Sequence, residues 1–405
     1  MNVIFVEPSF PNTQPQFVRG LAEIGATVIG IGETPEEHLS EDVRGYLTHY
    51  EHVGSVVDLG AMVHAVRTIQ GMVWVDRLEA TIEAHVMSAA RVREACGIPG
   101  TSVTTAFLCR DKPAMKQALR EAGIATAQSI GASTLDEIRG FAAAVGFPLI
   151  IKPPDAAGAA GTYRVDDPAQ LESVMAGLQD VSEVAVEEFV EGHEGFYDTL
   201  TIDGNVVHEF ISHYYPNVLE AMRTRWISPQ IVATNRVDSV EAYDEIKAMG
   251  RQAIAALGIG TSATHMEWFA SPKGLRFSEI ACRPPGVGTW DLYSTGNDLD
   301  LYKEWASAVV HGTPIRAASR RYATGLVALR PDRDGNILGY AGLDQIQGRY
   351  GELIIDSHLP PAGSPTQGVE AGYMANAWVR MRHPDYDELR GMLDDVGCTV
   401  KVRAG

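Results

Sequence analysis

A lysine at the end of an apolar run is followed by a stretch of small residues. Leu149-Ile150-Ile151-Lys152 has the composition of a buried strand, and residues 153–162 read Pro-Pro-Asp-Ala-Ala-Gly-Ala-Ala-Gly-Thr. Small residues let backbone amides approach a phosphate closely, and a neighbouring lysine supplies positive charge. The pattern fits a phosphate-binding loop, although an ordinary exposed turn after a strand has the same composition.

Two glutamates flank a Ser-Pro-Lys-Gly turn farther along the chain. If the hairpin is centred on Lys273, Glu267 and Glu279 stand directly opposite each other on one face. Adjacent carboxylates repel unless a cation lies between them, and magnesium is commonly held by one or two carboxylates plus nucleotide phosphates. The hairpin therefore predicts a magnesium site; the alternative is a like-charge pair on a solvated sheet face.

Counting by twos from Glu279 places Ala281 and Arg283 on the same face as the glutamates. An arginine there would lie where a transferring phosphoryl group needs positive charge. We also expect Phe269 and Phe277 to line this face, which would make the site a closed pocket.

Two further segments carry residues that suit ligand binding. In Val184–Glu194, an apolar strand runs into acidic residues, so the backbone could face an adenine edge and the acids could reach ribose hydroxyls. In His213–Trp226, aromatic residues accompany Arg223 and Arg225, and these could form a pocket for an organic carboxylate that Trp290 and Tyr293 extend. The alternatives are a solvated strand end and a structured surface loop.

The elements that must position these residues begin with an alternation of strands and helices in residues 1–105. This alternation predicts a parallel sheet covered by helices. Gly30-Ile31-Gly32 lacks a third glycine and follows the second strand, so a dinucleotide site is rejected. The expected elements are strands at Val3–Glu7, Ala26–Ile31 and Met72–Val75, a helix at Gln14–Ile24, and a strand–helix unit at Glu51–Ile69.

The remaining chain is expected to be helical at first, then rich in strands, then mixed. Asp111 can cap a helix that starts at Lys112-Pro113 and ends at Gly123. We expect further helices at Leu135–Val145, Val240–Leu257 and Leu299–Val310, strands from Val184 to about Val207, a hairpin at His265–Ile280, and a mixed α/β segment over the last ninety residues.

Composition limits the classes of partner. The chain has 405 residues with 33 Lys plus Arg against 52 Asp plus Glu, a formal charge of −19. So acidic a surface repels nucleic acid and anionic membranes, and no apolar run is long enough to span a bilayer. Four scattered cysteines and a first segment unlike a signal peptide favour a cytoplasmic protein.

The order of these parts resembles the ATP-grasp superfamily, in which two α+β lobes clamp ATP between them. The resemblance covers about residues 1–315. It rests on Gly97-Ile98-Pro99-Gly100-Thr101, Arg110-Asp111-Lys112 with Lys116 and Gly123-Ile124, Phe147–Pro153 with the small-residue loop, Glu187–Gly192, and Glu267 with Glu279. It implies an α/β and α+β protein: a Rossmann-like pre-ATP-grasp domain (1–105), an ATP-grasp domain (106–315, with a small lobe of about 106–190 and a large lobe of about 191–315), and a C-terminal mixed α/β subdomain (316–405).

The resemblance also implies individual roles. Lys112 and Lys152 would contact the α- and β-phosphates of ATP, and Glu267 and Glu279 would ligate Mg²⁺, for which Mn²⁺ is a substitute. Arg283 would act with Lys152 on the transferring phosphoryl group. The remaining implied contacts are a lid over the phosphates (Gly158, Gly161, Thr162), adenine binding (Glu187, Glu188, Phe189, Val190), packing near the adenine (Phe269), ribose binding (Glu194) and substrate carboxylate binding (Arg223, Arg225, Arg283).

One departure concerns the metal. Members of the superfamily commonly show Glu-x-Asn-x-Arg, whereas this chain has Glu279-Ile280-Ala281-Cys282-Arg283. Alanine cannot ligate a metal, so binding of a second ion is in question.

The favoured activity is a carboxylate–amine ligase of the dipeptide-ligase type, which forms an acyl phosphate and then an amide bond. Its partners would be a small-molecule carboxylate and an amine, and a homodimer is compatible with it. Alternatives are a carboxylase-like or purine-pathway enzyme, or a non-catalytic nucleotide-binding regulator, against which both lysines and both glutamates argue. Ala114-Met115-Lys116 is followed by Gln117 within an expected helix, so a fused biotin carrier is rejected.

Overall fold

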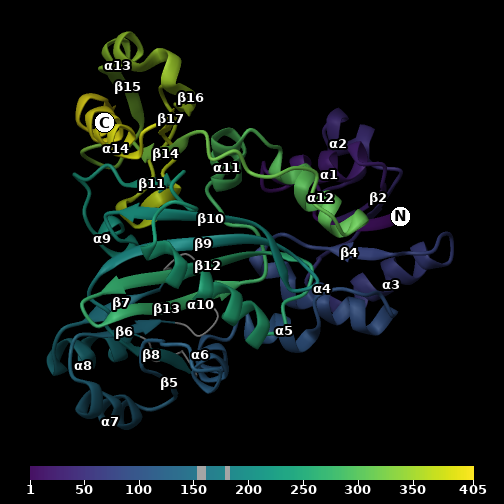
Figure 1. Ribbon diagram of the computed structural model, residues 1–405, viewed down its shortest axis with the longest axis horizontal. Helices are drawn as coiled ribbons and strands as arrows, with labels where there is room; N and C mark the ends of the chain where they lie inside the picture. The colour runs from purple at the N-terminus through teal and green to yellow at the C-terminus, as the bar shows by residue number, and fades with distance from the viewer. Residues whose placement is uncertain (153–160, 178–182) are drawn as a thin grey trace.

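The computed structural model describes residues 1–152, 161–177 and 183–405. At its N-terminal end lies a parallel sheet with the strand order β3-β2-β1-β4, on the right in Figure 1. Its apolar strands are covered by helices, as predicted. The strands are β1 (Asn2–Val6), β2 (Thr27–Gly32), β3 (His49–His52) and β4 (Arg77–Glu79), and the helices are α1 (Gln14–Glu23), α2 (Glu41–Tyr46), α3 (Leu59–Gln70) and α4 (Glu83–Cys96), with a 3-10 turn at Glu36–His38.

One strand of this sheet differs from the prediction. Met72–Val75 is not a strand: Met72 and Trp74 are exposed, and the fourth strand is Arg77–Glu79. The backbone N–H of Asp76 donates to Asn2 O, so pairing with β1 starts only after the apolar residues. Apolar composition alone therefore did not identify the residues that pair with β1.

Two helices lead from this sheet to the next lobe, namely α5 (Val103–Leu108) and α6 (Lys112–Glu121). The Asp111 carboxylate accepts a hydrogen bond from Ala114 N at 2.9 Å, which confirms the predicted cap and start of α6. The lobe itself is an antiparallel sheet in the order β5-β8-β6-β7. It comprises β5 (Ser129–Ala132), β6 (Leu149–Lys152), β7 (Tyr163–Val165), β8 (Val184–Glu188), α7 (Leu135–Val145) and α8 (Pro168–Gly177).

An eight-stranded sheet forms the centre of the molecule, in the order β13-β12-β9-β10-β11-β14-β17-β16 (Figure 1). Its strands are β9 (His193–Ile202), β10 (Asn205–Tyr215), β11 (Gln230–Ala233), β12 (Ser262–Ser271), β13 (Gly274–Ala281), β14 (Ala323–Ala328), β16 (Ile354–His358) and β17 (Trp378–His383). The expected hairpin is thus confirmed as β12–β13. Strand structure continues to Tyr215, so His213 lies in β10 and not in a loop after the sheet.

Each face of this sheet has its own core. Tyr197, Met266 and Trp268 pack with α6 and α10 (Ala242–Ala256). On the other face, Phe196 and Phe210 pack in one cluster that includes the aromatic residues of α11 (Thr289–Asn297) and α12 (Leu301–His311) and reaches α1. The second cluster therefore joins the central sheet to the N-terminal sheet.

The last ninety residues are mixed α/β, as expected, and three of their strands complete the central sheet. The other elements are β15 (Ile337–Ala341), which pairs with β18 (Lys401–Ala404), the helices α13 (Leu343–Tyr350) and α14 (Tyr386–Thr399), and 3-10 turns at Gly351–Leu353 and Val369–Met374. A short helix, α9 (Val218–Ala221), lies between β10 and β11. Because strands of both parts share one sheet, the domain boundary at residue 316 stays a prediction.

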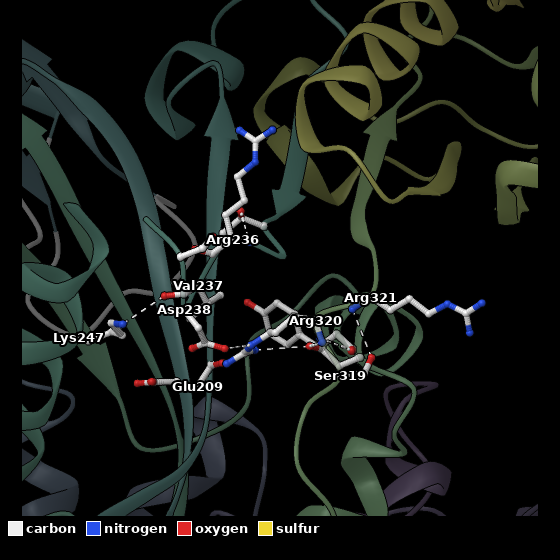
Figure 2. A network of polar contacts seen from close by, with 12 residues as sticks. Glu209, Arg236, Val237, Asp238, Lys247, Ser319, Arg320 and Arg321 are labelled. Atoms are coloured by element: carbon white, nitrogen blue, oxygen red, sulfur yellow. Dashed lines mark hydrogen bonds and ion pairs between the residues drawn. The ribbon is translucent and has the colours of Figure 1, made fainter. Parts of the chain in front are cut away.

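Arg320 links the segment between α12 and β14 to Asp238 and Glu209 by hydrogen bonds. Its Nε donates to Asp238 Oδ2 at 2.9 Å, and its Nη1 donates to the backbone carbonyl of Glu209 at 2.9 Å. Figure 2 shows this side chain reaching toward Asp238 and Glu209, whereas the neighbouring Arg321 side chain points away. Arg320 also adopts a left-handed backbone conformation (φ 53°), which only surrounding contacts would maintain.

No helix in the described ranges combines the length and the apolar composition needed to cross a bilayer.

We predict that Arg320→Ala lowers the free energy of unfolding by about 1–3 kcal/mol, because the partly buried carbonyl of Glu209 loses its donor and the exposed Asp238 carboxylate loses its ion pair. Urea denaturation provides the measurement. Arg321→Ala is the matched control, since the Arg321 side chain is 63% exposed against 17% for Arg320, and it should change stability by less than about 0.5 kcal/mol. Equal losses in both variants would contradict this role for Arg320.

Candidate functional site

The β12–β13 hairpin brings the two predicted metal-binding glutamates together. Glu267 pairs directly with Glu279, which confirms that they are opposite. The predicted centre at Lys273 is wrong, because Ser271 pairs with Gly274 and leaves a two-residue loop. A register shift next to Glu267 adds one residue, Ser278, to β13, and this bulge restores the glutamate pairing.

The bulge also reverses which side chains share a face. Phe277 pairs with Trp268 and is fully buried in the cluster under α6 and α10. The expectation that Phe277 lines the glutamate face is therefore wrong, since an extra residue inverts the alternation of a strand. Phe269 remains half-buried, opposite Glu194 of β9.

Three lysines, two from α6 and one from β6, form ion pairs with Glu279 and with Glu187 of β8. Lys112 Nζ lies 3.2 Å from Glu279 Oε2, at the junction of α6 and β13. Lys152, at the end of β6, lies 3.0 Å from Glu187 Oε2, and Lys116 Nζ lies 2.6 Å from Glu187 Oε1. The structure therefore brings Lys112, Lys152, Glu187 and Glu279 into one charged network between two lobes.

Lys116 had no predicted role, although its spacing from Lys112 carried a signal. Lys112 and Lys116 are four residues apart on α6, so they lie on the same side of the helix. Lys116 is fully buried, and a buried ammonium requires a partner. Two lysines at this spacing in a buried helix could have indicated a shared acidic site.

Burial and ion pairing shift the pKa values of the groups in this network in opposite directions. Burial alone would raise the pKa of Glu187, but Lys116 and Lys152 outweigh it and hold that pKa at about 2. Burial lowers the pKa of Lys116 to about 8 despite Glu187. For Lys152, burial would lower the pKa, yet Glu187, Glu279 and Glu267 raise it. The pKa of Glu279 is likewise lowered, because Lys112 and Lys152 outweigh its burial.

The segment predicted to bind adenine follows directly from β8. The Glu187 side chain points into the lysine pair, whereas the Glu188 carboxylate accepts from Gln128 N at 2.9 Å. The N–H groups of Glu188 and Phe189 donate to Gln128 O and Pro148 O. The Phe189 ring lies 4.3 Å from the Arg164 guanidinium. An adenine would therefore have to use other backbone groups here, such as those of Val190.

Glu194 is a buried acid near the start of β9. Its Oε2 accepts from the backbone N–H of Val218 at 2.7 Å, and Asn217 Oδ1 accepts from its N–H at 3.0 Å. Burial, together with the nearby Glu267 carboxylate, raises the pKa of Glu194 to about 8. A carboxyl group that is protonated this easily can donate a hydrogen bond as well as accept one.

A histidine that the sequence interpretation did not single out supports the glutamate pair. His265 Nδ1 donates to Asp198 Oδ1 at 2.7 Å, and its Nε2 lies 3.7 Å from Glu267 Oε1. The Tyr293 hydroxyl donates to Asp198 Oδ2 at 2.6 Å. Burial would lower the pKa of His265, but Asp198 and Glu267 raise it to about 9. His265 pairs across the hairpin with Ala281, so an imidazole faces the position where the expected metal-binding asparagine is missing.

Arg283 lies just beyond β13, facing the N-terminal sheet. Its Nε donates to Glu83 Oε2 at 2.6 Å and its Nη1 donates to Pro284 O at 2.7 Å. Glu83 begins α4 and also accepts from Arg110 through its backbone carbonyl. Arg283 is thus held at the junction between the hairpin and the N-terminal sheet.

Other predicted site residues lie apart from this network or outside the described ranges. Arg225 forms a two-point ion pair with Asp334, at 2.9 and 2.7 Å, and Arg223 is exposed. Gly161 is exposed with a left-handed backbone (φ 67°), next to Thr162. Gly158 lies outside the described residues. The roles of these residues stay predictions.

The donor set suits one hard divalent cation better than a multi-ligand metal centre. Across the described ranges, no group of three or more His, Cys, Asp or Glu side chains is arranged to hold a metal. Glu267 and Glu279 are instead a pair of carboxylates, which fits Mg²⁺ because this ion takes one or two carboxylates and completes its shell with phosphates and water.

A family model matches the part of the chain that holds most of the site. The model of the ATP-grasp domain family matches residues 117–296, a range that contains Lys152, Glu187, Glu267 and Glu279. Lys112 lies just before it.

Two curated relatives and one solved structure are similar to the chain over long stretches. An L-arginine-specific L-amino acid ligase of Bacillus subtilis is 25% identical over 316 residues, 76% of this chain and 75% of that protein. A formate-dependent phosphoribosylglycinamide formyltransferase of Chlorobaculum tepidum is 28% identical over 248 residues, 59% of this chain and 60% of that protein. The structure of an L-amino acid ligase from Bacillus licheniformis superimposes with a TM-score of 0.79 at 18% identity, covering 100% of this chain and 98% of that one.

We predict that Glu194 makes the protein less stable as pH rises. Its pKa is about 8 in the folded state against 4.5 for the ordinary side chain, so between these values the folded state keeps a proton that the unfolded state releases. The associated stability is complete below about pH 4.5 and lost as pH passes 8. Between pH 5 and 8, the wild type should lose roughly 2–4 kcal/mol more than Glu194→Gln.

Urea denaturation at several pH values, with EDTA and without nucleotide, measures this difference. Glu191→Gln is the control, because Glu191 is exposed in the same segment, and it should follow the wild type. Parallel pH curves for wild type and Glu194→Gln would show that Glu194 titrates normally.

Proposed function

We propose that the chain, whose residues 117–296 match the model of the ATP-grasp domain family, is an ATP-dependent carboxylate–amine ligase. It activates an organic acid, such as an amino acid, as an acyl phosphate, forms an amide bond with an amine, and releases ADP and phosphate. The observation that carries this proposal is the meeting of Glu267 and Glu279 with Lys112 and Lys152 between two lobes. That arrangement provides both a cation site and positive charge for phosphates.

The acidic pair accounts for the metal requirement. Glu267 and Glu279 would hold Mg²⁺, with Mn²⁺ as a substitute, and the bound ion supplies positive charge to the phosphate oxygens. Lys112 lies against Glu279 and is close enough to exchange this carboxylate for a phosphate oxygen. His265, anchored by Asp198, keeps positive charge beside Glu267. Together these groups limit the repulsion between the two carboxylates.

The chemistry explains why a phosphoryl group must be transferred. A carboxylate is a poor electrophile, because its negative charge repels nucleophiles and oxide is a very poor leaving group. Transfer of the γ-phosphoryl converts that oxygen into a phosphate leaving group, and the transfer is favoured by fixed positive charge around the moving group. In this proposal Lys152 and Arg283 supply this charge.

The amine then attacks the acyl phosphate. Its attack competes with water, so the acid and the amine must be held next to each other while water is excluded. Arg283 is well placed to bind the substrate carboxylate, since Glu83 fixes it at the junction of the hairpin and the N-terminal sheet. Arg223, exposed in the loop after β10, remains a candidate for a further carboxylate contact.

The nucleotide contacts follow the same proposal. Val190 and neighbouring backbone groups would bind adenine beside Phe189 and Phe269, and Glu194 would bind the ribose. Gly161 and Thr162 would cover the phosphates. We also propose the division into 1–105, 106–315 and 316–405, a cytoplasmic location and a homodimer as the working assembly.

Amino acids are the favoured substrates because two of the similar proteins are L-amino acid ligases. A purine-pathway reaction is the second candidate, on the strength of the 28% identity with a phosphoribosylglycinamide formyltransferase. Assaying ATP consumption with pooled amino acids, and separately with phosphoribosylglycinamide plus formate, distinguishes the two. A regulator without catalysis would consume ATP in neither assay.

We expect Glu279→Gln to lower turnover at least about a hundredfold, because one of two cation-binding charges is lost while the side chain keeps its shape. Turnover is measured as phosphate release at saturating Mg²⁺. Glu191→Gln, an exposed acid outside the network, is the matched control and should keep wild-type turnover. Near-normal turnover of Glu279→Gln would remove this residue from the mechanism.

We expect ADP and inorganic phosphate to form in equal amounts with each new amide bond. An acyl-phosphate route releases these products, whereas an acyl-adenylate route releases AMP and pyrophosphate. Chromatography of the nucleotides, with mass spectrometry of the amide product, provides the measurement. AMP as the stoichiometric product would rule out the acyl-phosphate mechanism.

A further inference from the structure

We propose that a basic cleft between the C-terminal strand and the segment before β11 binds a second ligand, an organic polyanion that carries a flat ring, of which a mononucleotide is the simplest example. The cleft has a volume of about 510 Å³, within the usual range for small-molecule sites. It is lined by Arg225, Trp226, Ser228, Arg330, Pro331, Asp332, Arg333, Gly397, Val400, Lys401, Val402, Arg403 and Ala404. This set contains none of the residues assigned to phosphate, metal or adenine binding.

The charge of the cleft contrasts with the charge of the chain. Five cationic side chains line it, whereas the whole protein carries a formal charge of −19. Asp332 is the one acid among the lining residues, and Asp334 pairs with Arg225 beside them, so positive charge remains in excess. Lys401 and Arg403 alternate with the buried Val402 on β18 and are both exposed, so they project from the same side of the strand. A multiply charged anion would relieve their mutual repulsion.

Arg330 gives the cleft a fixed donor group. Its Nη1 donates to Thr224 O at 2.9 Å and to Ala221 O, and its Nη2 donates to Gly372 O at 2.7 Å. These are carbonyl groups, so they orient the guanidinium without neutralising its full charge. Burial, with Arg225 nearby, lowers the pKa of Arg330. A half-buried cation held in this way favours an anion next to it.

Trp226 supplies the second feature that a ligand with a ring would use. Its side chain is 88% exposed, although it lines the same cleft as the cationic residues. An exposed indole is a surface on which a flat ring can stack, and stacking of a base on an aromatic side chain contributes about 1–3 kcal/mol. The combination of an aromatic platform with several cations is the chemistry that recognises a nucleotide.

Equilibrium binding of two probes to the full chain tests the proposal: AMP, which has a ring, and inorganic pyrophosphate, which has none. Titration calorimetry in EDTA should show that Lys401→Glu with Arg403→Glu weakens binding of both probes at least tenfold. Trp226→Ala should weaken AMP binding roughly tenfold and leave pyrophosphate binding unchanged. The matched control is Arg67→Glu with Arg91→Glu, two exposed arginines of α3 and α4, which changes net charge equally and should stay within twofold of wild type.

Unchanged binding of both probes to the Lys401/Arg403 variant would overturn the proposal, because AMP would then be bound only in the ATP site. Equal effects of Trp226→Ala on both probes would overturn the assignment of a ring. If the double glutamate variant does not fold, as judged by urea denaturation, Lys401→Gln with Arg403→Gln serves the same purpose. ATP turnover is not the readout, so failure here leaves the ligase proposal intact.

Discussion

A buried carboxylate between one buried and one partly buried lysine is the interaction on which the arrangement of the site depends. Glu187 contacts Lys116 of α6 and Lys152 of β6. Removing these groups from water is costly, and the cost is offset only when all three come together with good geometry. Their pairing therefore requires the small-lobe sheet to dock against α6. The same docking fixes Lys152 and Lys112 in front of the hairpin glutamates.

The carboxylates of the large lobe repel one another, in contrast to the attractive pairing around Glu187. Glu194, Glu267 and Glu279 lie on neighbouring strands, and cationic groups outside this set offset their repulsion: Lys112 lies against Glu279, and His265 lies beside Glu267. Burial and the nearby Glu267 carboxylate raise the pKa of Glu194 to about 8, although Lys152 acts to lower it. A divalent cation between Glu267 and Glu279 would offset the repulsion that remains.

The central sheet explains how distant parts of the chain act on this site. Strands from both sides of residue 316 pair in one sheet, and α11 and α12 pack between it and the N-terminal sheet. Asp198 and Tyr293, which hold His265, come from β9 and α11. Arg225, by contrast, pairs with Asp334 in the C-terminal part of the chain. Arg225 and Trp226, in the loop between β10 and β11, therefore line the basic cleft.

Much of the local structure was determined by the sequence alone, because its signals are local. The cap at Asp111, the helix at Leu135–Val145 and the strand ending in Lys152 depend on near neighbours in the chain. Tertiary structure decided the rest. Phe277 left the glutamate face because of a single bulge, Lys116 acquired a role only when β8 brought Glu187 to it, and Arg283 met Glu83 across 200 positions of sequence. Burial and long-range charge are properties of the folded chain, so residue spacing could name the candidate groups but could not say which of them would meet.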